Sequence, residues 1–229
     1  MKTVFSKNKD ILELVDISGE ISDIAGAIGL LSWDQETYMP PKGAGARAHH
    51  LATLAGIYHE KLTNPKVGAL LRSASRATKG RLNIYDKALL REVKRDYEKA
   101  TKLPKKLVKE TSQATSMAFE AWQRAKEKSE WEMFSPQLER LLRLKIEAAN
   151  LLKKAGQSAY DSMLDDHEPG LTESDVEKVF TPVRGKITEL AKKLGVITKG
   201  RGEVLERIKF DRQTLIEGAK KIVTAMGYD

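Results

Sequence analysis

One stretch of sequence decides the fold: ILELVDISGEISDIAGAIGLLSWDQETYMPPKG, residues 11–43. Apolar residues recur in its first two thirds at steps of three or four positions, which is the pattern of an amphipathic α-helix. They are Ile11, Leu14, Ile17, Ile21, Ile24, Ile28 and Leu31. Pro40-Pro41 and Gly43 mark the latest point at which this helix can end, because proline lacks the backbone donor and clashes with the preceding turn.

The same periodicity continues after this turn. It predicts a second helix over residues 45–62 and a third over residues 82–101. Pro104 and Ser135-Pro136 are typical of helix starts, because the amide hydrogens of a first turn have no partner within the helix. The sequence therefore predicts a fourth and a fifth helix there, and Gly156 is placed to cap the end of the fifth.

The last part of the chain predicts two more helices. One apolar pattern runs from Val176 to Leu194 and passes through Pro182, which predicts a single kinked helix. The last helix should run from Asp211, as its cap, to Met226. No alternating strand pattern competes. We therefore predict an all-α fold, a bundle of about seven helices in a single helical domain over residues 1–229, with antiparallel neighbours joined by short connections.

Composition limits the possible setting of the protein. With 229 residues and 41% apolar content the chain can bury a core, and the absence of cysteine excludes disulfides and thiolate metal sites. Residues 1–10 carry charges without the apolar run of a secretory signal. No apolar run approaches the roughly 20 residues needed to span a bilayer. We expect a soluble, cytoplasmic protein with no membrane partner.

The net charge of +8 is unevenly distributed. Residues 72–109 contain 13 Lys or Arg against four acids, a local charge of +9, whereas residues 161–177 contain seven acids and no Lys or Arg. A basic surface can bind nucleic acid by releasing counterions. The aromatic residues of the basic segment, Tyr85 and Tyr97, lie on the predicted inward face, however, and we favour charges that surround solvated helices.

Four segments together resemble a known family. They are Trp33-Asp34-Gln35-Glu36-Thr37-Tyr38-Met39-Pro40-Pro41-Lys42-Gly43, the pattern Ala-x-x-Arg-Ala-x-x-Leu-Ala-Thr-Leu from Ala44 to Leu54, FSPQLERL at residues 134–141, and YDSMLDDHEPGLT at residues 160–172. The last is close to Tyr-Asp-x-Leu-Leu-Asp-x-Tyr-Glu-Pro-Gly, with His167 in place of the usual Tyr. These segments resemble the N-terminal region of the carboxypeptidase Taq family of zinc metallocarboxypeptidases.

This resemblance implies a fold that corresponds to the N-terminal half of a larger helical metallopeptidase. The family places its chemistry in a His-Glu-x-x-His helix, a second glutamate ligand, a His-Pro-Phe segment and arginine-bearing substrate motifs, all of which would lie beyond Asp229. Zinc is accordingly expected in full-length family members only. We nominate no catalytic, cofactor-binding or metal-ligating residue in this chain, and we expect the chain to be inactive alone.

The histidines do not have the spacing of a zinc site. A helical site needs two histidines four positions apart, so that both imidazoles project from one face, and a third ligand. His49, His50, His59 and His167 include no such pair. His59-Glu60 begins like the motif, but Thr63 stands where the second histidine would be. We interpret these residues as solvated helix histidines.

An acidic cluster is the best local alternative for a site. It contains Asp161, Asp165, Asp166, His167 and Glu168. Such a group could hold a divalent cation or supply an acid and a base, but it lacks the glycine-punctuated spacing of a calcium loop. We interpret it as a turn whose hydrated acids favour the positive end of the following helix.

A glycine pair and the three tryptophans are two further features of the sequence. Gly200-x-Gly202 lacks the remaining glycine and the flanking strand of a dinucleotide-binding loop, and it predicts a flexible turn. Trp33, Trp122 and Trp131 continue or adjoin apolar faces. Core packing or an interface is the expected role of these tryptophans.

Three functional hypotheses follow from the sequence. In the first, the chain is one half of a metallocarboxypeptidase, and a separate C-terminal half completes the substrate groove. In the second, it is a stand-alone helical interaction or regulatory module that forms a homo-oligomer. The third, a basic nucleic-acid-binding module, is the one we favour least.

Overall fold

The computed structural model describes residues 4–77, 82–197, 209 and 211–228. Within these residues the secondary structure is helical and contains no β-strand, which confirms the predicted all-α class. The chain divides into two compact units, unit 1 (Met1–Thr172) and unit 2 (Glu173–Asp229), and each is described by itself. In the part of the chain that is described, no helix combines the length and the apolar content needed to cross a membrane.

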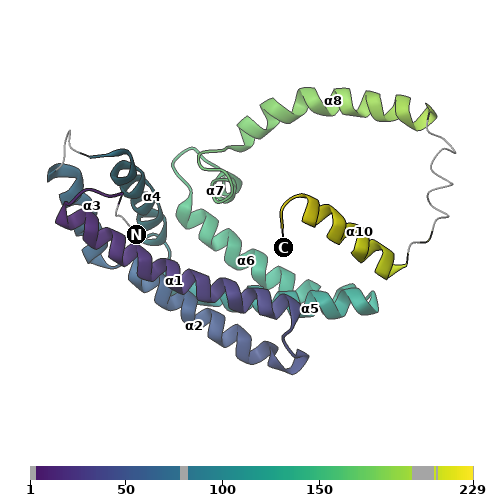
Figure 1. The fold of residues 1–229 in the computed structure, drawn as a ribbon, viewed down its shortest axis with the longest axis horizontal. Coiled ribbons are helices and arrows are strands. Elements are labelled where there is room, and N and C mark those ends of the chain that lie inside the picture. The colour runs from purple at the N-terminus through teal and green to yellow at the C-terminus, as the bar shows by residue number, and fades with distance from the viewer. Residues whose placement is uncertain (1–3, 78–81, 198–208, 210, 229) are drawn as a thin grey trace. The chain divides into compact units, whose positions relative to one another are not determined.

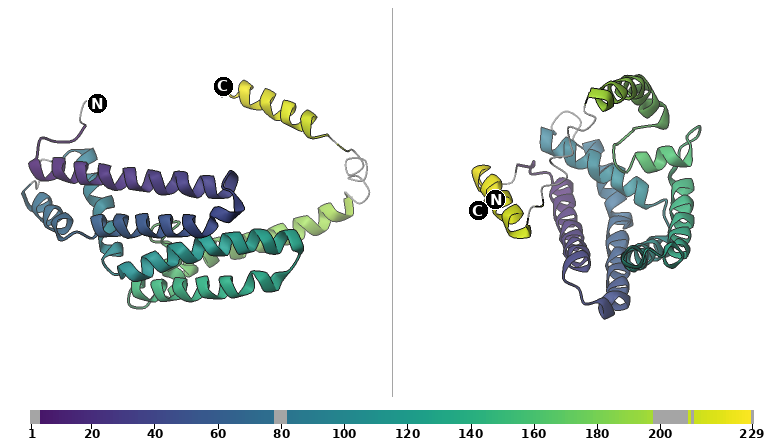
Figure 2. Two further views of the ribbon diagram at one scale, coloured as in Figure 1. Left: turned by 90° about the horizontal axis from the view of Figure 1, so that it is seen from below. Right: turned by 90° about the vertical axis from the view of Figure 1, so that its right-hand side faces the viewer.

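Unit 1 is built from antiparallel helices joined by short turns (Figure 1). Its elements are α1 (Lys9–Thr37), η1 (Pro41–Gly43), α2 (Ala44–Leu62), α3 (Pro65–Ala77), α4 (Ile84–Ala100), α5 (Lys105–Lys128), η2 (Trp131–Met133), α6 (Ser135–Leu152) and α7 (Ala159–Leu164). Helices α1, α2, α5 and α6 lie side by side in that order and alternate in direction (Figure 2). Helices α3 and α4 pack near the N-terminal end of α1.

Side-chain caps fix the starts of α1 and α4. Asn8 accepts hydrogen bonds from the amides of Asp10 and Ile11 at the start of α1. Asn83 and Asp86 form a capping box at the start of α4. Asp86 is fully buried, and its carboxylate also accepts a hydrogen bond from the Ser6 amide at 3.0 Å. A single aspartate thus caps α4 and ties the N-terminal segment to it.

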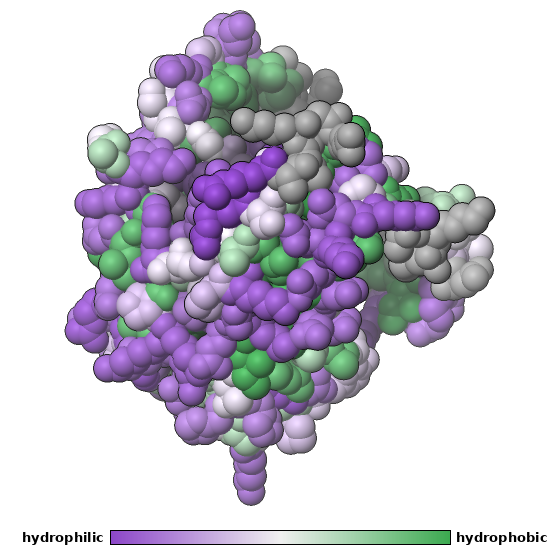
Figure 3. Space-filling view, turned by 90° about the vertical axis from the view of Figure 1, so that its left-hand side faces the viewer, coloured by the Kyte–Doolittle hydropathy of each residue, from purple (hydrophilic) through white to green (hydrophobic). Residues whose placement is uncertain are grey.

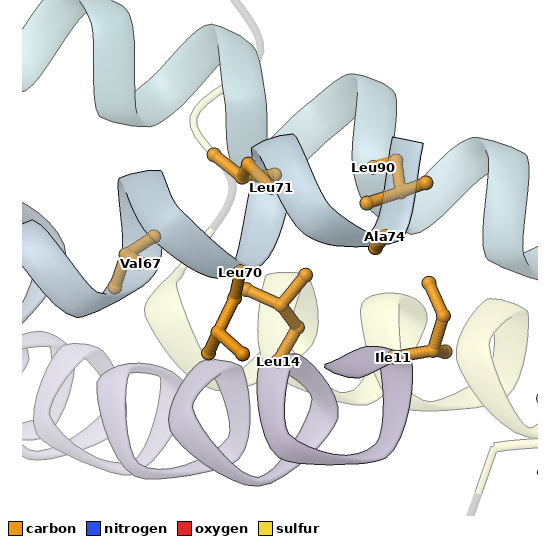
Figure 4. Close-up of a cluster of buried hydrophobic side chains, with 7 residues drawn as sticks. All are labelled: Ile11, Leu14, Val67, Leu70, Leu71, Ala74 and Leu90. Carbon is orange, nitrogen blue, oxygen red and sulfur yellow. The ribbon is translucent and has the colours of Figure 1, made fainter. Parts of the chain in front are cut away.

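The main hydrophobic cluster joins α1, α3 and α4 (Figure 4). It consists of Ile11 and Leu14 from α1, Val67, Leu70, Leu71 and Ala74 from α3, and Leu90 from α4. The largest helix interface in unit 1, between α2 and α5, is lined instead by small buried residues such as Ala48, Ala52, Ala114 and Ala118. Small side chains let two helices approach closely, and so α2 and α5 form the centre of the bundle.

Unit 2 contains α8 (Glu173–Ile197) and α10 (Arg212–Ala225). Helix α8 continues through Pro182 as a single helix, as predicted, and the kink at this residue stays a prediction. Asp211 is the cap of α10, and its carboxylate accepts a hydrogen bond from the Thr214 amide at 3.0 Å. This confirms the predicted start of the last helix.

The seven predicted helices are all present, and the described residues contain two more. The additional helices are α3 and α7, at positions where the sequence analysis assigned none. Gly156 does not cap α6, because that helix ends at Leu152 with Lys153 as its cap residue. Gly156 adopts a positive φ of 80° in the turn that follows, a conformation that glycine tolerates best.

Candidate functional site

The corner between α1 and α2 carries the first family-like segment. Arg47 on α2 donates one hydrogen bond to the Leu31 carbonyl and a second, of 2.5 Å, to the carboxylate of Asp34. The Arg47 side chain is only 14% exposed, so water screens this contact weakly. Because a guanidinium carries several donors in a fixed geometry, one residue holds both the backbone and a side chain of α1.

A second contact at this corner is a buried polar pair. The side-chain amide of Gln35 donates to the Ser116 carbonyl at 3.2 Å, and the Ser116 hydroxyl donates to the Gln35 side-chain oxygen at 2.7 Å. Both residues are buried. Each partner satisfies the other, so the pair avoids the penalty of an unpaired buried polar group and positions the end of α1 on α5.

We expect Arg47→Lys to lower the free energy of unfolding by about 1–2 kcal/mol. Lysine keeps the positive charge, but its single ammonium group cannot reproduce the two-directional contact with Leu31 and Asp34. Urea denaturation measures the loss. The matched control is Arg143→Lys on α6, an exposed arginine 3.4 Å from Glu139, which should change stability by less than about 0.5 kcal/mol. Equal losses in the two variants would contradict the anchoring role of Arg47.

The acidic cluster folds around α7 and the turn after it. Asp161 and Ser158 form a capping box at the start of α7, with hydrogen bonds of 2.8 and 3.0 Å. Lys99 of α4 forms ion pairs with Asp165 at 2.5 Å and with Asp166 at 2.8 Å. Of these three carboxylates, the first caps α7 and the other two bind Lys99. The Asp165 side chain is only 24% exposed and pairs with Lys99, so the expectation that it stays hydrated is wrong. The Asp166 side chain is 56% exposed, so it stays hydrated while it pairs with Lys99.

Lys99 also sets the electrostatics of this turn. Its hydrogen bond lowers the pKa of Asp165 against the opposing effect of burial, and the backbone amide of Gly170, 2.8 Å away, lowers it further. Burial alone would lower the pKa of Lys99, but the hydrogen bonds to Asp165 and Asp166 raise it overall. Both shifts favour the charged forms of the two partners.

Lys99→Met should weaken the acid dependence of stability. Because the pKa of Asp165 is lower in the folded than in the unfolded chain, its stabilisation is present above the unfolded value of about 3.9 and is lost as the pH falls through the folded value. The unmodified chain should therefore lose about 1 kcal/mol more than the variant between about pH 5 and pH 2. Urea denaturation across this range tests the difference. Lys106→Met, whose partner Glu110 lies 3.8 Å away at the surface, should leave the pH profile unchanged.

A cavity of about 250 Å³ opens among α5, α6 and α7. Leu107, Ala149, Leu152 and Met163 contribute its apolar lining, and the Ser162 side chain also faces it. The Ser162 hydroxyl donates to the carbonyls of residues 149 and 159 at 2.9 and 2.8 Å. Its hydrogen atom is directed at backbone carbonyls, and no side-chain base among the described residues forms a hydrogen bond with it. Nucleophilic catalysis by this serine is therefore not supported.

His59 is buried, so its interpretation as a solvated histidine is wrong. Its Nε2 atom lies 3.0 Å from the Ala100 carbonyl oxygen and 2.8 Å from that of Leu103. Two carbonyl acceptors require Nε2 to carry the proton. His59 therefore links the end of α2 to the turn between α4 and α5. His49, His50 and His167 are exposed, as predicted.

The side chains of residues 4–77, 82–197 and 211–228 do not form a binding site for the zinc ion that the resemblance implies. No group of three or more His, Cys, Asp or Glu side chains in these ranges is arranged to hold a metal ion. His59 directs Nε2 at backbone carbonyls, and Lys99 holds Asp165 and Asp166. These side chains are therefore not available as zinc ligands.

The basic segment is partly neutralised by ion pairs. Lys99 binds the acidic turn, and Lys105 forms an ion pair with Glu60. Tyr97 packs against the hydrophobic cluster, as predicted. The inward placement of Tyr85 is wrong, because its side chain is exposed at the start of α4.

The tryptophans do not belong to the core. Trp33, Trp122 and Trp131 are all exposed, and each packs against one neighbouring aromatic ring, with centroid distances between 5.4 and 5.8 Å. The expected role in core packing is therefore wrong, and the role in an interface stays a prediction. The predicted turn at Gly200-x-Gly202 lies outside the described residues.

Comparison with known proteins shows that this helical arrangement is the one found in metallocarboxypeptidases. Residues 13–229 match the family described as carboxypeptidase Taq (M32) metallopeptidase. The solved structure of the Pyrococcus furiosus carboxypeptidase has 29% identity and a TM-score of 0.77, over 98% of this chain and 45% of that one. Metallocarboxypeptidase 1 of Trypanosoma cruzi has 29% identity and a TM-score of 0.68, over 89% and 40%. The chain belongs to the carboxypeptidase Taq family.

The chain spans less than half the length of the curated relatives that it matches. Thermostable carboxypeptidase 1 of Pyrococcus furiosus is 32% identical over 216 residues, which are 93% of this chain and 42% of that protein. Thermostable carboxypeptidase 1 of Thermus thermophilus is 28% identical over 229 residues, 94% and 44% respectively. The fold described above therefore corresponds to the N-terminal half of the family fold.

Proposed function

We propose that this chain is the N-terminal half of a metallocarboxypeptidase and forms part of the substrate groove. Hydrolysis then requires a separate C-terminal half, which carries the zinc ligands, and the chain alone is inactive. The proposal places the complex in the cytoplasm and treats residues 1–229 as one helical domain of it. The observation that supports it best is an apolar stripe on α8 that the other described residues of unit 2 leave exposed.

The stripe follows the helical repeat of α8. Its residues are Val179, Phe180, Val183, Ile187, Leu190 and Leu194, all between 40% and 62% exposed. Apart from the adjacent Val179 and Phe180, steps of three and four positions place them along one side of the helix. Burying a large apolar side chain contributes about 1.5–3 kcal/mol, so six exposed ones favour association with a partner surface.

Helix α10 and the residues after it carry apolar side chains of the same kind. Leu215, Ile216, Ile222, Val223 and Met226 are all exposed. Within the described part of unit 2, both helices therefore leave apolar side chains uncovered by each other. The matched relatives contain more than half of their length beyond the matched part, which supports the C-terminal half as the covering partner.

Complementation tests this proposal. The chain is co-expressed with the part of Pyrococcus furiosus thermostable carboxypeptidase 1 that it does not match, and zinc-dependent release of C-terminal amino acids is measured. We expect a 1:1 complex with activity, and no activity from the chain alone. The positive control joins that same part to its own N-terminal part. Activity in the control without complex formation by this chain would contradict the proposal, as would zinc-dependent activity of the chain alone.

The exposed stripe also supports a second candidate, a homo-oligomeric interaction module. In that case, two copies would cover their α8 stripes with one another. Analytical ultracentrifugation of the purified chain separates the two candidates. A stable dimer that does not dissociate when the C-terminal half is added favours the module. A monomer favours the split peptidase, and so does a dimer that dissociates when the C-terminal half is added.

A further inference from the structure

A second cavity, of about 290 Å³, lies between α3 and α4 within unit 1. One face of each helix lines it. The lining residues are Gly68, Leu71, Arg72, Ser75 and Arg76 from α3, and Lys94, Tyr97 and Glu98 from α4. Spacings of three and four positions bring the members of each set together on their helix.

Positive charge predominates in this lining. Arg72, Arg76 and Lys94 face a single acid, Glu98, whose carboxylate lies 3.8 Å from the Lys94 ammonium group. Among the described residues, neither Arg72 nor Arg76 has an ion pair or a side-chain hydrogen bond, and both are exposed. Figure 3 looks at the end of unit 1 that carries α3 and α4, and hydrophilic side chains predominate there.

Arg72 and Arg76 lie four positions apart on α3 with like charges, which destabilises a helix. At the same spacing, Glu120 faces Arg124 at 3.5 Å, Glu139 faces Arg143 at 3.4 Å, and Glu189 faces Lys193 at 2.6 Å. Like charges four positions apart also occur elsewhere, for example Arg91 and Arg95 on α4, but those two share the acid Glu92. Among the described residues, Arg72 and Arg76 have no acid within ion-pair distance. An anion between them would remove this repulsion.

The floor of the cavity is tightly packed. A Cβ atom built on Gly68 would lie 2.5 Å from the Tyr97 hydroxyl oxygen, so the ring fits only because residue 68 is glycine. Tyr97 also packs against the hydrophobic cluster. Gly68 and Tyr97 therefore form a closely packed part of the cavity wall.

We propose that this cavity binds a small phosphate-type anion, either inorganic pyrophosphate or phosphate, or the phosphate group of a small phosphomonoester. Arg72 and Arg76 each donate paired hydrogen bonds to phosphate oxygens, and Lys94 contributes a third positive charge. The lining has a net charge of +2, which favours such an anion. The volume exceeds that of phosphate and leaves room for the rest of a small ester. This site is independent of the peptidase proposal, because it lies wholly within unit 1.

Titrations followed by NMR test the site. The side-chain Nε–H signals of the arginines in the full chain are recorded with inorganic phosphate, with pyrophosphate and with adenosine monophosphate, at constant ionic strength set by chloride. We expect saturable shifts confined to Arg72 and Arg76. If pyrophosphate and phosphate bind more tightly than the nucleotide, the free anion is the ligand. If the nucleotide binds more tightly, a phosphomonoester is the ligand.

Two sets of variants separate site binding from general charge. Arg72→Gln/Arg76→Gln should weaken binding by about tenfold or more, whereas Arg124→Gln/Arg143→Gln removes two charges elsewhere in unit 1 and should change it less than about twofold. Gly68→Ala should weaken binding without removing charge, because it displaces Tyr97; circular dichroism verifies that each variant is folded. Shifts spread over all arginines, equal losses in both double variants, or saturable binding of a single-stranded oligonucleotide alone would overturn the proposal.

Discussion

Leu14→Ala is expected to lower the free energy of unfolding by about 3–4 kcal/mol. Leu14 is fully buried in the cluster where α1 meets α3 and α4. The substitution removes buried apolar surface and leaves a cavity that Val67 and Leu70 cannot fill without moving their helix. Since the stability of a whole domain is about 5–15 kcal/mol, a large part of it depends on this side chain.

The control for this prediction lies on the same helix. Leu30 is 64% exposed, so Leu30→Ala removes the same atoms without opening a cavity, and it should change the free energy of unfolding by less than about 0.5 kcal/mol. Urea denaturation gives both values, provided that the slope of the unfolding free energy with urea is the same in both variants. A small effect of Leu14→Ala would mean that α3 is not packed on α1 as described.

The helices that the sequence predicts well are those whose pattern is long and locally complete. Residues 11–31 repeat their apolar positions over many turns, and the structure has a helix from Lys9 to Thr37. Helix α3 was missed although Val67, Leu70, Leu71 and Ala74 follow the same repeat. Pro65 is the reason. A proline just after a helix is typical of its end, and the second helix was predicted over residues 45–62, but Pro65 is also the first residue of α3.

The contacts of the candidate site depend on residues far apart in the chain, and the sequence gives little indication of them. His59 is buried because the turn at Ala100–Leu103 packs over it, and Gln35 finds Ser116, 81 positions away. Helical periodicity predicts on which face of its helix a residue lies, but it does not predict which residue of another helix it contacts. The contact between Arg47 and Asp34 is the exception. Both residues flank the predicted Pro-Pro turn, and an antiparallel arrangement would bring them together.

The other large expected effect concerns the α8 stripe. Phe180→Glu/Ile187→Glu should abolish complex formation with the complementing C-terminal half, and with it the recovered peptidase activity. Each substitution removes about 1.5–3 kcal/mol of apolar burial at the interface and adds a charge that would have to be desolvated. Together they correspond to a loss of affinity of at least about 100-fold. Sedimentation of the mixed halves measures the affinity, and zinc-dependent amino-acid release measures the activity.

The matched control is displaced by one position along the same helix. Thr181→Glu/Thr188→Glu introduces the same two charges with the same spacing, but on the side of α8 away from the stripe. It should leave complex formation within about twofold of the unmodified chain, because a solvated surface tolerates added charge. If both double variants lose the complex equally, added charge is the cause and the stripe is not the interface. If neither loses it, another surface holds the C-terminal half, and the apolar residues of α10 become the next to test by the same design.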